Sequence, residues 1–148
     1  MRLTSAFAAT ALALALSAAP AFAQTPAAEE EAGVRAALQH YLNGHATGDP
    51  EEFRKAFHPE ARMTFVREGK ITITPISEYI ARASGKPPAD EAKRVRRITS
   101  VEVVGNAAFG RIELDYPTVF FVDYMSLLKE NGRWMIIAKS FHAEPKKK

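Results

Sequence analysis

Asn131 and Gly132 constrain this chain more than any other pair of residues, because they separate two long apolar runs. Asn-Gly between such runs is the strongest short-range signal for a two-residue type I′ hairpin turn. The turn fixes a register in which Glu130 faces Arg133, and every further pair follows by counting outward. The pairs expected on one face are Ser126 with Ile137, Tyr124 with Lys139, and Val122 with Phe141. Those expected on the other face are Leu127 with Ile136, Met125 with Ala138, Asp123 with Ser140, and Phe121 with His142.

Both faces of this predicted hairpin are largely apolar. A sheet that is apolar on both sides is covered on both sides, because exposed apolar area is unfavourable. We expect the helices of the chain to cover one face and a partner subunit to cover the other. The hairpin therefore predicts a sheet between two layers.

The first 23 residues are a predicted secretory signal peptide. Arg2 gives a short positive start, residues 6–19 form an apolar run, and Ala-Phe-Ala at 21–23 is a typical cleavage site. The run is short for a membrane span, and no later stretch could serve as one. We expect cleavage after Ala23, a flexible leader over residues 24–28, and a periplasmic or secreted chain with no membrane contact after cleavage.

Composition limits the classes of function that remain. The sequence has no cysteine, which excludes disulfides and thiol chemistry, and its formal net charge is +3. The basic residues are scattered apart from a short cluster at 93–97 and a basic tail over 144–148. A nucleic-acid interface needs such charge on one face together with aromatic residues or a known motif, so we predict no nucleic-acid partner.

The remaining pattern places helices early and strands late in one domain. Apolar residues at helical spacing predict a helix over 29–45. Asp49, followed by Pro50 and Glu52, predicts a second helix that begins with a capping box. A short third helix is expected over 76–84. Strands are expected over 61–67, 71–74, 92–104, 107–116, 120–130 and 133–142. This order predicts an α+β fold in which helices pack on one face of a bent antiparallel sheet.

Two parts of the sequence resemble a known superfamily. Residues 38–57, continued by Phe-His-Pro-Glu-Ala at 57–61, resemble the opening of nuclear transport factor 2-like proteins, which include ketosteroid isomerases and SnoaL-like cyclases. Asp-Tyr-Met-Ser-Leu-Leu-Lys at 123–129, Asn-Gly-Arg-Trp at 131–134 and Phe-His at 141–142 resemble the putative lumazine-binding family of that group. The resemblance implies one domain over 29–143, a cystatin-like roll whose curved antiparallel sheet forms a cone closed by three helices. It also implies a small-molecule ligand in the cone and a homodimer through the convex face.

The resemblance also bears on one enzymatic activity. It aligns Tyr41 with the oxyanion-hole tyrosine of the ketosteroid isomerases, whereas Phe65 and Phe120 stand where those enzymes carry their two aspartates. That isomerisation needs a carboxylate base to move the proton and two donors to stabilise the enolate. We therefore predict that this chain lacks ketosteroid isomerase activity.

The same alignment predicts a ligand pocket on the concave face of the sheet. Its expected residues are Tyr41, Phe65, Phe120, Tyr124, Lys139 and Phe141. An apolar cavity with a few convergent polar groups is the usual form of a ligand site. A desolvated lysine there could act as a base or imine nucleophile, or could pair with an anionic group of a ligand. Alternatively, Lys139 could hydrogen-bond Tyr124 or an acid, or extend its stem to water.

Three functions are consistent with these patterns. The first is a dimeric binding domain for a small, partly aromatic molecule. The second is a SnoaL-like cyclase, dehydratase or isomerase that uses Tyr41 and Lys139 as acid and base. The third is a non-catalytic interaction module whose cavity is filled by phenylalanine side chains. The four histidines lack metal-ligand spacing and the chain lacks a glycine-rich phosphate loop, so we predict no metal and no cofactor.

Overall fold

A computed structural model of the chain describes residues 27–147. The predicted signal peptide and its cleavage site lie outside these residues. The first helix begins at Ala27, inside the leader predicted over 24–28. The last strand continues to Pro145, past the domain end predicted at 143. Lys146 is also held, because its N–H donates to the carbonyl of Thr118.

The helices are α1 (Ala27–Thr47), α2 (Pro50–Ala56), α3 (Ile76–Ile80) and the short 3₁₀ helix η1 (Glu91–Lys93). α3 ends four residues before the predicted 84. The N–H groups of Arg82 and Ala83 donate to carbonyls three residues back, so the chain tightens into a turn there.

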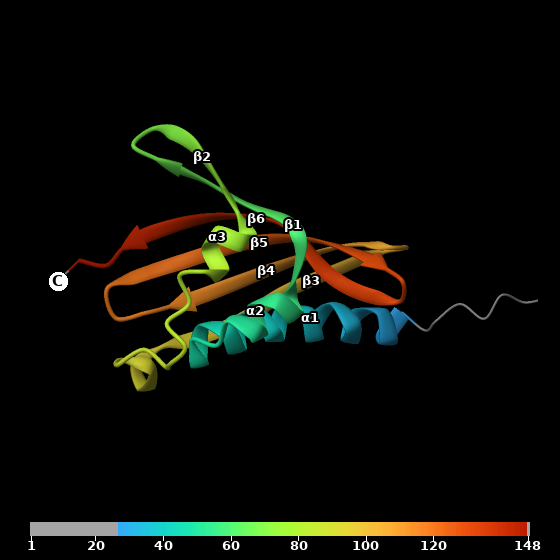
Figure 1. Cartoon of the computed structure of the whole chain (residues 1–148), viewed down its shortest axis with the longest axis horizontal. Helices are drawn as coiled ribbons and strands as arrows, with labels where there is room; N and C mark the ends of the chain where they lie inside the picture. The colour runs from blue at the N-terminus through green and yellow to red at the C-terminus, as the bar shows by residue number, and fades with distance from the viewer. Residues whose placement is uncertain (1–26, 148) are drawn as a thin grey trace, which may run out of the picture.

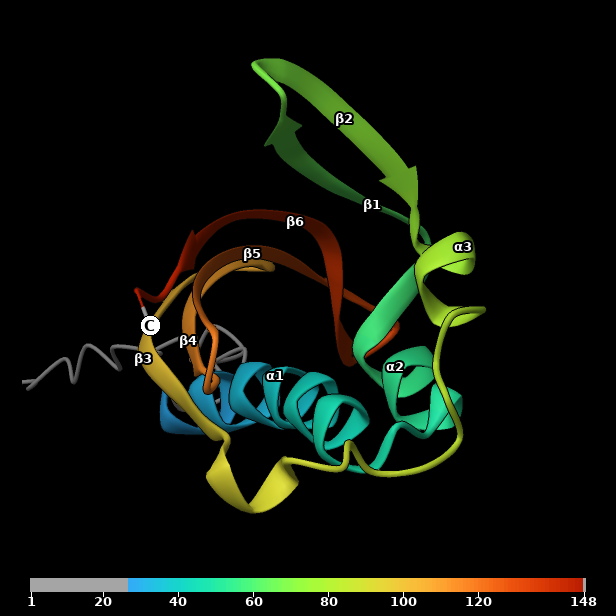
Figure 2. The same cartoon turned by 90° about the vertical axis from the view of Figure 1, so that its left-hand side faces the viewer.

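The strands are β1 (Phe57–Arg67), β2 (Lys70–Pro75), β3 (Val95–Val104), β4 (Ala107–Asp115), β5 (Val119–Glu130) and β6 (Arg133–Pro145). They form one sheet in the order β2-β1-β6-β5-β4-β3, which curls over α1 while the β1–β2 hairpin projects away from the body (Figures 1 and 2). The predicted α+β class and curved sheet are confirmed. The sheet is not wholly antiparallel, because β1 and β6 pair in parallel. Distant segments can pair in this way, whereas strands joined by a tight turn cannot.

The hairpin turn forms as predicted, but the register beyond it does not. Asn131 and Gly132 have φ angles of 50° and 80°, the positive values that a type I′ turn requires. Leu127 pairs with Ile136 as expected. Ile137 is then an extra residue in β6, a β-bulge that shifts every later pair by one position.

Because of the bulge, the pairs beyond Leu127 and Ile136 differ from those predicted. The observed pairs after it are Ser126 with Ala138, Met125 with Lys139, Tyr124 with Ser140, Asp123 with Phe141, Val122 with His142, and Phe121 with Ala143. The predicted pairing of Tyr124 with Lys139 is therefore wrong. Because one extra residue reverses the alternation in β6, Lys139 and Phe141 lie on the concave face with Asp123, whereas Tyr124 lies on the convex face.

The concave face of the sheet packs on α1 to form the core. Val34, Leu38 and Tyr41 on α1 are fully buried. α1 approaches β4 closely at Gly110, where an added Cβ atom would lie 2.6 Å from a methyl carbon of Leu38. A Cβ atom here would force the end of the Leu38 side chain to shift, because real Cβ atoms essentially never lie so near a carbon atom. The close approach fixes α1 under the curved sheet.

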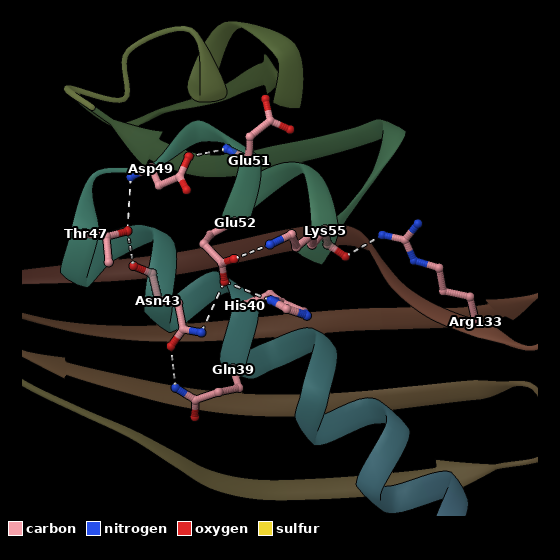
Figure 3. A network of polar contacts seen from close by, with 9 residues as sticks. All are labelled: Gln39, His40, Asn43, Thr47, Asp49, Glu51, Glu52, Lys55 and Arg133. Atoms are coloured by element: carbon pink, nitrogen blue, oxygen red, sulfur yellow. Dashed lines mark hydrogen bonds and ion pairs between the residues drawn. The ribbon is translucent and has the colours of Figure 1, made fainter. Parts of the chain in front are cut away.

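The beginning of α2 is only partly as predicted (Figure 3). The side chain of Asp49 caps the helix by accepting a hydrogen bond from the N–H of Glu51 at 2.8 Å. Glu52 does not complete the capping box, because the N–H of Asp49 donates to the hydroxyl of Thr47 instead. The cap therefore depends on Asp49 alone.

Glu52 instead connects α2 to α1 (Figure 3). Its carboxylate lies 2.8 Å from Nδ1 of His40 and accepts hydrogen bonds from Asn43 at 3.1 Å and from Lys55 at 2.6 Å. The hydrogen bond with His40 and that with Lys55 lower the pKa of Glu52 from 4.5 to about 2. This side chain therefore holds the two helices together.

We predict that Glu52→Gln lowers the free energy of unfolding at pH 7 by about 1 kcal/mol, a small value because water screens a partly exposed charge. A carboxyl group with a lowered pKa stabilises the fold above its unfolded value of 4.5, and this contribution is lost as pH falls towards 2. The variant should therefore lose less stability than the native chain over that acid interval, measured by urea denaturation.

Glu51→Gln is the matched control, because it removes the same charge from the same helical turn at an exposed side chain. We expect it to change stability by less than about 0.5 kcal/mol. Equal effects of the two substitutions would show that helix charge, not the bridge to α1, carries the contribution of Glu52.

Candidate functional site

A buried cluster of three polar side chains joins the sheet to α1. Nζ of Lys139 on β6 lies 3.0 Å from Oδ2 of Asp123 on β5 and donates a hydrogen bond to the hydroxyl of Tyr41 at 2.5 Å. The same hydroxyl donates to Oδ2 of Asp123 at 2.6 Å. Asp123 and Tyr41 are fully buried, and Lys139 is 5% exposed. The cluster is a closed triangle of one cation, one anion and one phenol.

Burial sets the electrostatics of this cluster. Desolvation raises the pKa of Tyr41 well above its usual range, and the charge of Asp123 raises it further, so the phenol stays neutral and donates. Desolvation also lowers the pKa of Lys139, while the carboxylate of Asp123 opposes that shift. Oδ1 of Asp123 has no hydrogen-bond partner among the described residues. The carboxylate therefore retains an unused acceptor.

Lys139 reaches a cavity of about 1010 Å³ at the wide end of the cone. The cavity lies between the end of α1, the inner side of β1, α3 with the loop after it, and the sheet. Aromatic rings form much of its wall, and Phe65 and Phe141 contact each other with ring centres 4.8 Å apart. Nζ of Lys139 lies 4.7 Å from the ring centre of Phe141. The arrangement places an amine among aromatic surfaces.

His45 and Tyr79 add a second polar pair to the cavity wall. Nε2 of His45 lies 2.9 Å from the hydroxyl of Tyr79 in a shared hydrogen bond. Desolvation lowers the pKa of His45 well below 6.5, and repulsion from Lys139, Arg96 and Arg94 lowers it further. The imidazole is therefore neutral at pH 7 and can donate or accept one proton.

The structure brings some of the predicted pocket residues together and separates others. Phe65, Lys139 and Phe141 line the cavity. Tyr41 lies behind the wall, where it holds Lys139 from α1. Phe120 and Tyr124 do not face the cavity. On β5 they alternate with Phe121 and Asp123, which lie on the concave face, so the face predicted for β5 is wrong. Tyr124 is 44% exposed on the convex face.

Sequence reasoning missed Asp123 as a member of the site. Asp123 is the only charged residue between positions 119 and 128, and its neighbours on the same face, Phe121 and Met125, are apolar. A lone acid on an apolar face signals a buried partner. The straight hairpin register assigned Ser140 as that partner, and the bulge replaces it with Lys139 on the same face.

Residues 27–147 contain neither a metal-binding cluster nor a membrane-spanning helix. No group of three histidine, cysteine, aspartate or glutamate side chains in this range could hold a metal ion. None of the helices described is long and apolar enough to cross a membrane.

Comparison with known families gives a match over most of the chain. The family model described as "Putative lumazine-binding" matches residues 29–142. Among curated proteins, the chain is similar to Aldolase FrzH of a Cladobotryum species, with 20% identity over 106 residues that cover 72% of this chain and 85% of that protein.

Solved structures share the fold. An NTF2-like protein of unknown function from Shewanella baltica has a TM-score of 0.75 and 27% identity, covering 83% of this chain and all of that one. An NTF2-like protein of unknown function from Silicibacter pomeroyi has a TM-score of 0.71 and 23% identity, covering 81% and 100%. These neighbours support a nuclear transport factor 2-like fold.

We predict that Lys139→Met lowers the free energy of unfolding by about 3–5 kcal/mol, because it leaves the Asp123 carboxylate buried without its cation. The double variant Asp123→Leu/Lys139→Met should lose much less than the sum of its single substitutions, since removing both charges also removes their desolvation cost. Urea denaturation of the four proteins gives this coupling energy.

Lys129→Met is the matched control, because Lys129 also joins the sheet to α1 by an ion pair, with Glu30 at 2.6 Å. That pair is partly exposed, so we expect a loss of about 1 kcal/mol or less. Additive effects at Asp123 and Lys139 would contradict the coupled cluster.

Proposed function

Because this chain belongs to the putative lumazine-binding family, we propose that its cone binds a small, partly aromatic organic molecule. The observation that carries the proposal is the cavity of about 1010 Å³ lined by aromatic rings. Ligand sites for small molecules commonly occupy about 300–1,000 Å³ and combine apolar walls with few polar groups. Phe65 and Phe141 leave this space open, which argues against a module whose cavity is filled by side chains.

The wall offers two kinds of contact to such a ligand. The paired rings of Phe65 and Phe141 present a surface for offset or edge stacking. The amine of Lys139 and the His45–Tyr79 pair supply hydrogen bonds that would orient the ligand. A molecule with an aromatic ring and one or two polar substituents satisfies both.

The proposal includes a homodimer and an extracytoplasmic location. The convex face carries Phe109 stacked on Tyr124, with ring centres 5.8 Å apart, and Leu128, which is 48% exposed. Exposed apolar side chains that gather on one face favour a protein partner. The apolar run and the Ala-Phe-Ala site within residues 1–23 support export with cleavage after Ala23.

We predict that the neutral fluorescent probe N-phenyl-1-naphthylamine binds the purified protein and that lumazine displaces it. Phe141→Ala should raise the dissociation constant of the probe about fivefold, because one aromatic contact contributes about 1 kcal/mol. Fluorescence titration measures both effects, and circular dichroism checks that the variant is folded.

Phe109→Ala is the control, because it removes a ring of the same size from the convex face. Its dissociation constant for the probe should match that of the native chain. Native mass spectrometry of the same preparations should give a native dimer that begins at Gln24 and a Phe109→Ala variant shifted towards monomer. Absence of probe binding in the native protein would refute the proposed ligand site.

A second candidate function is an enzyme that uses Tyr41 and Lys139. The 2.5 Å contact between their polar atoms, beside an open cavity, favours it, as does the similarity to a protein named as an aldolase. A neutral Lys139 amine could attack a ligand carbonyl carbon, forming a C–N bond and, on loss of water, an imine. Tyr41 lies behind the wall and contacts Nζ at 2.5 Å, so it could pass to that nitrogen the proton that the departing oxygen requires.

We predict for this candidate that borohydride traps acetophenone on Lys139, since reduction of the imine makes the C–N bond permanent. Peptide mapping by mass spectrometry should find the adduct at residue 139 in greater yield than at Lys70, an exposed lysine outside the cavity. Excess lumazine should suppress it. Equal labelling at both lysines would exclude this imine mechanism and leave the binding function intact.

A further inference from the structure

The charged residues that line the cavity are all basic. Arg67, Arg82, Arg94 and Lys139 contribute to its wall, and no aspartate or glutamate does. The acids that pair with these cations, Asp123, Asp90 and Glu78, are not among the residues that line the cavity. The cavity wall therefore presents positive charge next to aromatic surface, which is a more specific environment than an apolar wall.

The counter-charges are unequal among these four residues. Lys139 is paired with the buried Asp123 at 3.0 Å, Arg94 with Asp90 at 2.8 Å, and Arg82 with the exposed Glu78 at 3.8 Å. For Arg67, no ion pair occurs with any residue in the described range 27–147. Its guanidinium lies 5.1 Å from the ring centre of Phe65, its neighbour on the inner side of β1. Arg67 is exposed, and it is the one of these four cations that has no ion pair in that range.

Arg94 adds positive charge at another part of the wall. Its guanidinium carbon lies 4.2 Å from the ring centre of Tyr116, so an aromatic face supports it. The charges of Arg94, Arg96 and Lys139 all lower the pKa of His45, after the larger effect of desolvation. Three cations therefore act on the buried imidazole of His45 at the cavity wall.

We propose that the ligand of this cone is an aromatic anion, whose acid group pairs with Arg67 while its ring lies against Phe65 and Phe141. This inference rests on the proposed binding function and names its ligand class. The guanidinium group is planar and presents donors that match a carboxylate or similar acid group in two parallel hydrogen bonds. Phe65 touches both Arg67 and Phe141, so the acid site and the stacking surface adjoin.

Two fluorescent probes with the same aromatic skeleton test this proposal. 1-Anilinonaphthalene-8-sulfonate carries an acid group, whereas N-phenyl-1-naphthylamine lacks it. A change in cavity shape should alter the dissociation constants of both probes alike, so it leaves their ratio unchanged. Loss of a contact to the acid group should alter the ratio. Arg67→Gln removes the charge at the proposed contact, and Arg97→Gln removes an exposed charge on β3 outside the cavity.

We expect Arg67→Gln to weaken binding of the sulfonate about fivefold and that of the neutral probe less than twofold, because only the sulfonate loses a charge-assisted contact. Arg97→Gln should leave the ratio unchanged. Raising NaCl from about 50 to 500 mM should weaken binding of the sulfonate to the native protein more than binding of the neutral probe, because salt screens partly exposed charges.

The outcomes separate this inference from the binding function. If both probes bind and Arg67→Gln leaves their ratio unchanged, the anionic class is overturned while the binding function stands. If neither probe binds the native protein, the binding function itself fails and this inference fails with it. A change in ratio of equal size in Arg97→Gln would also overturn the inference, because general surface charge would then explain it.

Discussion

The extra residue at Ile137 decides which side chains enter the cone. Along a strand, side chains alternate between faces, so a single unpaired residue reverses the alternation for all that follow. Trp134 and Ile136 face α1 before the bulge, and Lys139 and Phe141 face the same side after it. Without the bulge, small and polar residues of β6 would line the interior. The chemistry of the cavity therefore depends on one local irregularity in the hydrogen-bond ladder.

The triangle of Lys139, Asp123 and Tyr41 is the electrostatic consequence of that irregularity. Taking a lysine and a carboxylate out of water is expensive, and their attraction offsets this cost only when geometry and hydrogen bonds are good. Here the phenol donates to the carboxylate and accepts from the ammonium group, so α1 completes the pair that the strands create. The cluster thus links sheet and helix directly below the cavity. A structural and a ligand-facing role can coexist, because Lys139 also reaches the wall.

Aromatic rings and basic groups occupy the cavity wall together, and this combination suits a binding domain and an enzyme better than an interaction module. An interaction module needs no hollow, whereas a binding domain needs one with few well-placed polar groups. The Lys139–Tyr41 contact also supplies the proton donor and amine that an enzyme of this fold could use. Family membership and the fold of the neighbours do not distinguish a binding domain from an enzyme, because fold alone does not determine chemistry.

The sequence by itself determined the turn at Asn131-Gly132 and the order of helices and strands, since positive φ angles and apolar periodicity are local properties. The family followed from the resemblance of residues 38–61 and 123–142 to its members. Three residues of the predicted pocket, Phe65, Lys139 and Phe141, line the cavity. Only the tertiary structure decided the bulge, because both faces of the hairpin are apolar and neither register was excluded by burial. For the same reason the sequence did not predict the ion pair of Asp123 with Lys139 or the parallel pairing of β1 with β6. These features depend on packing between segments far apart in the chain, where local pattern carries no information.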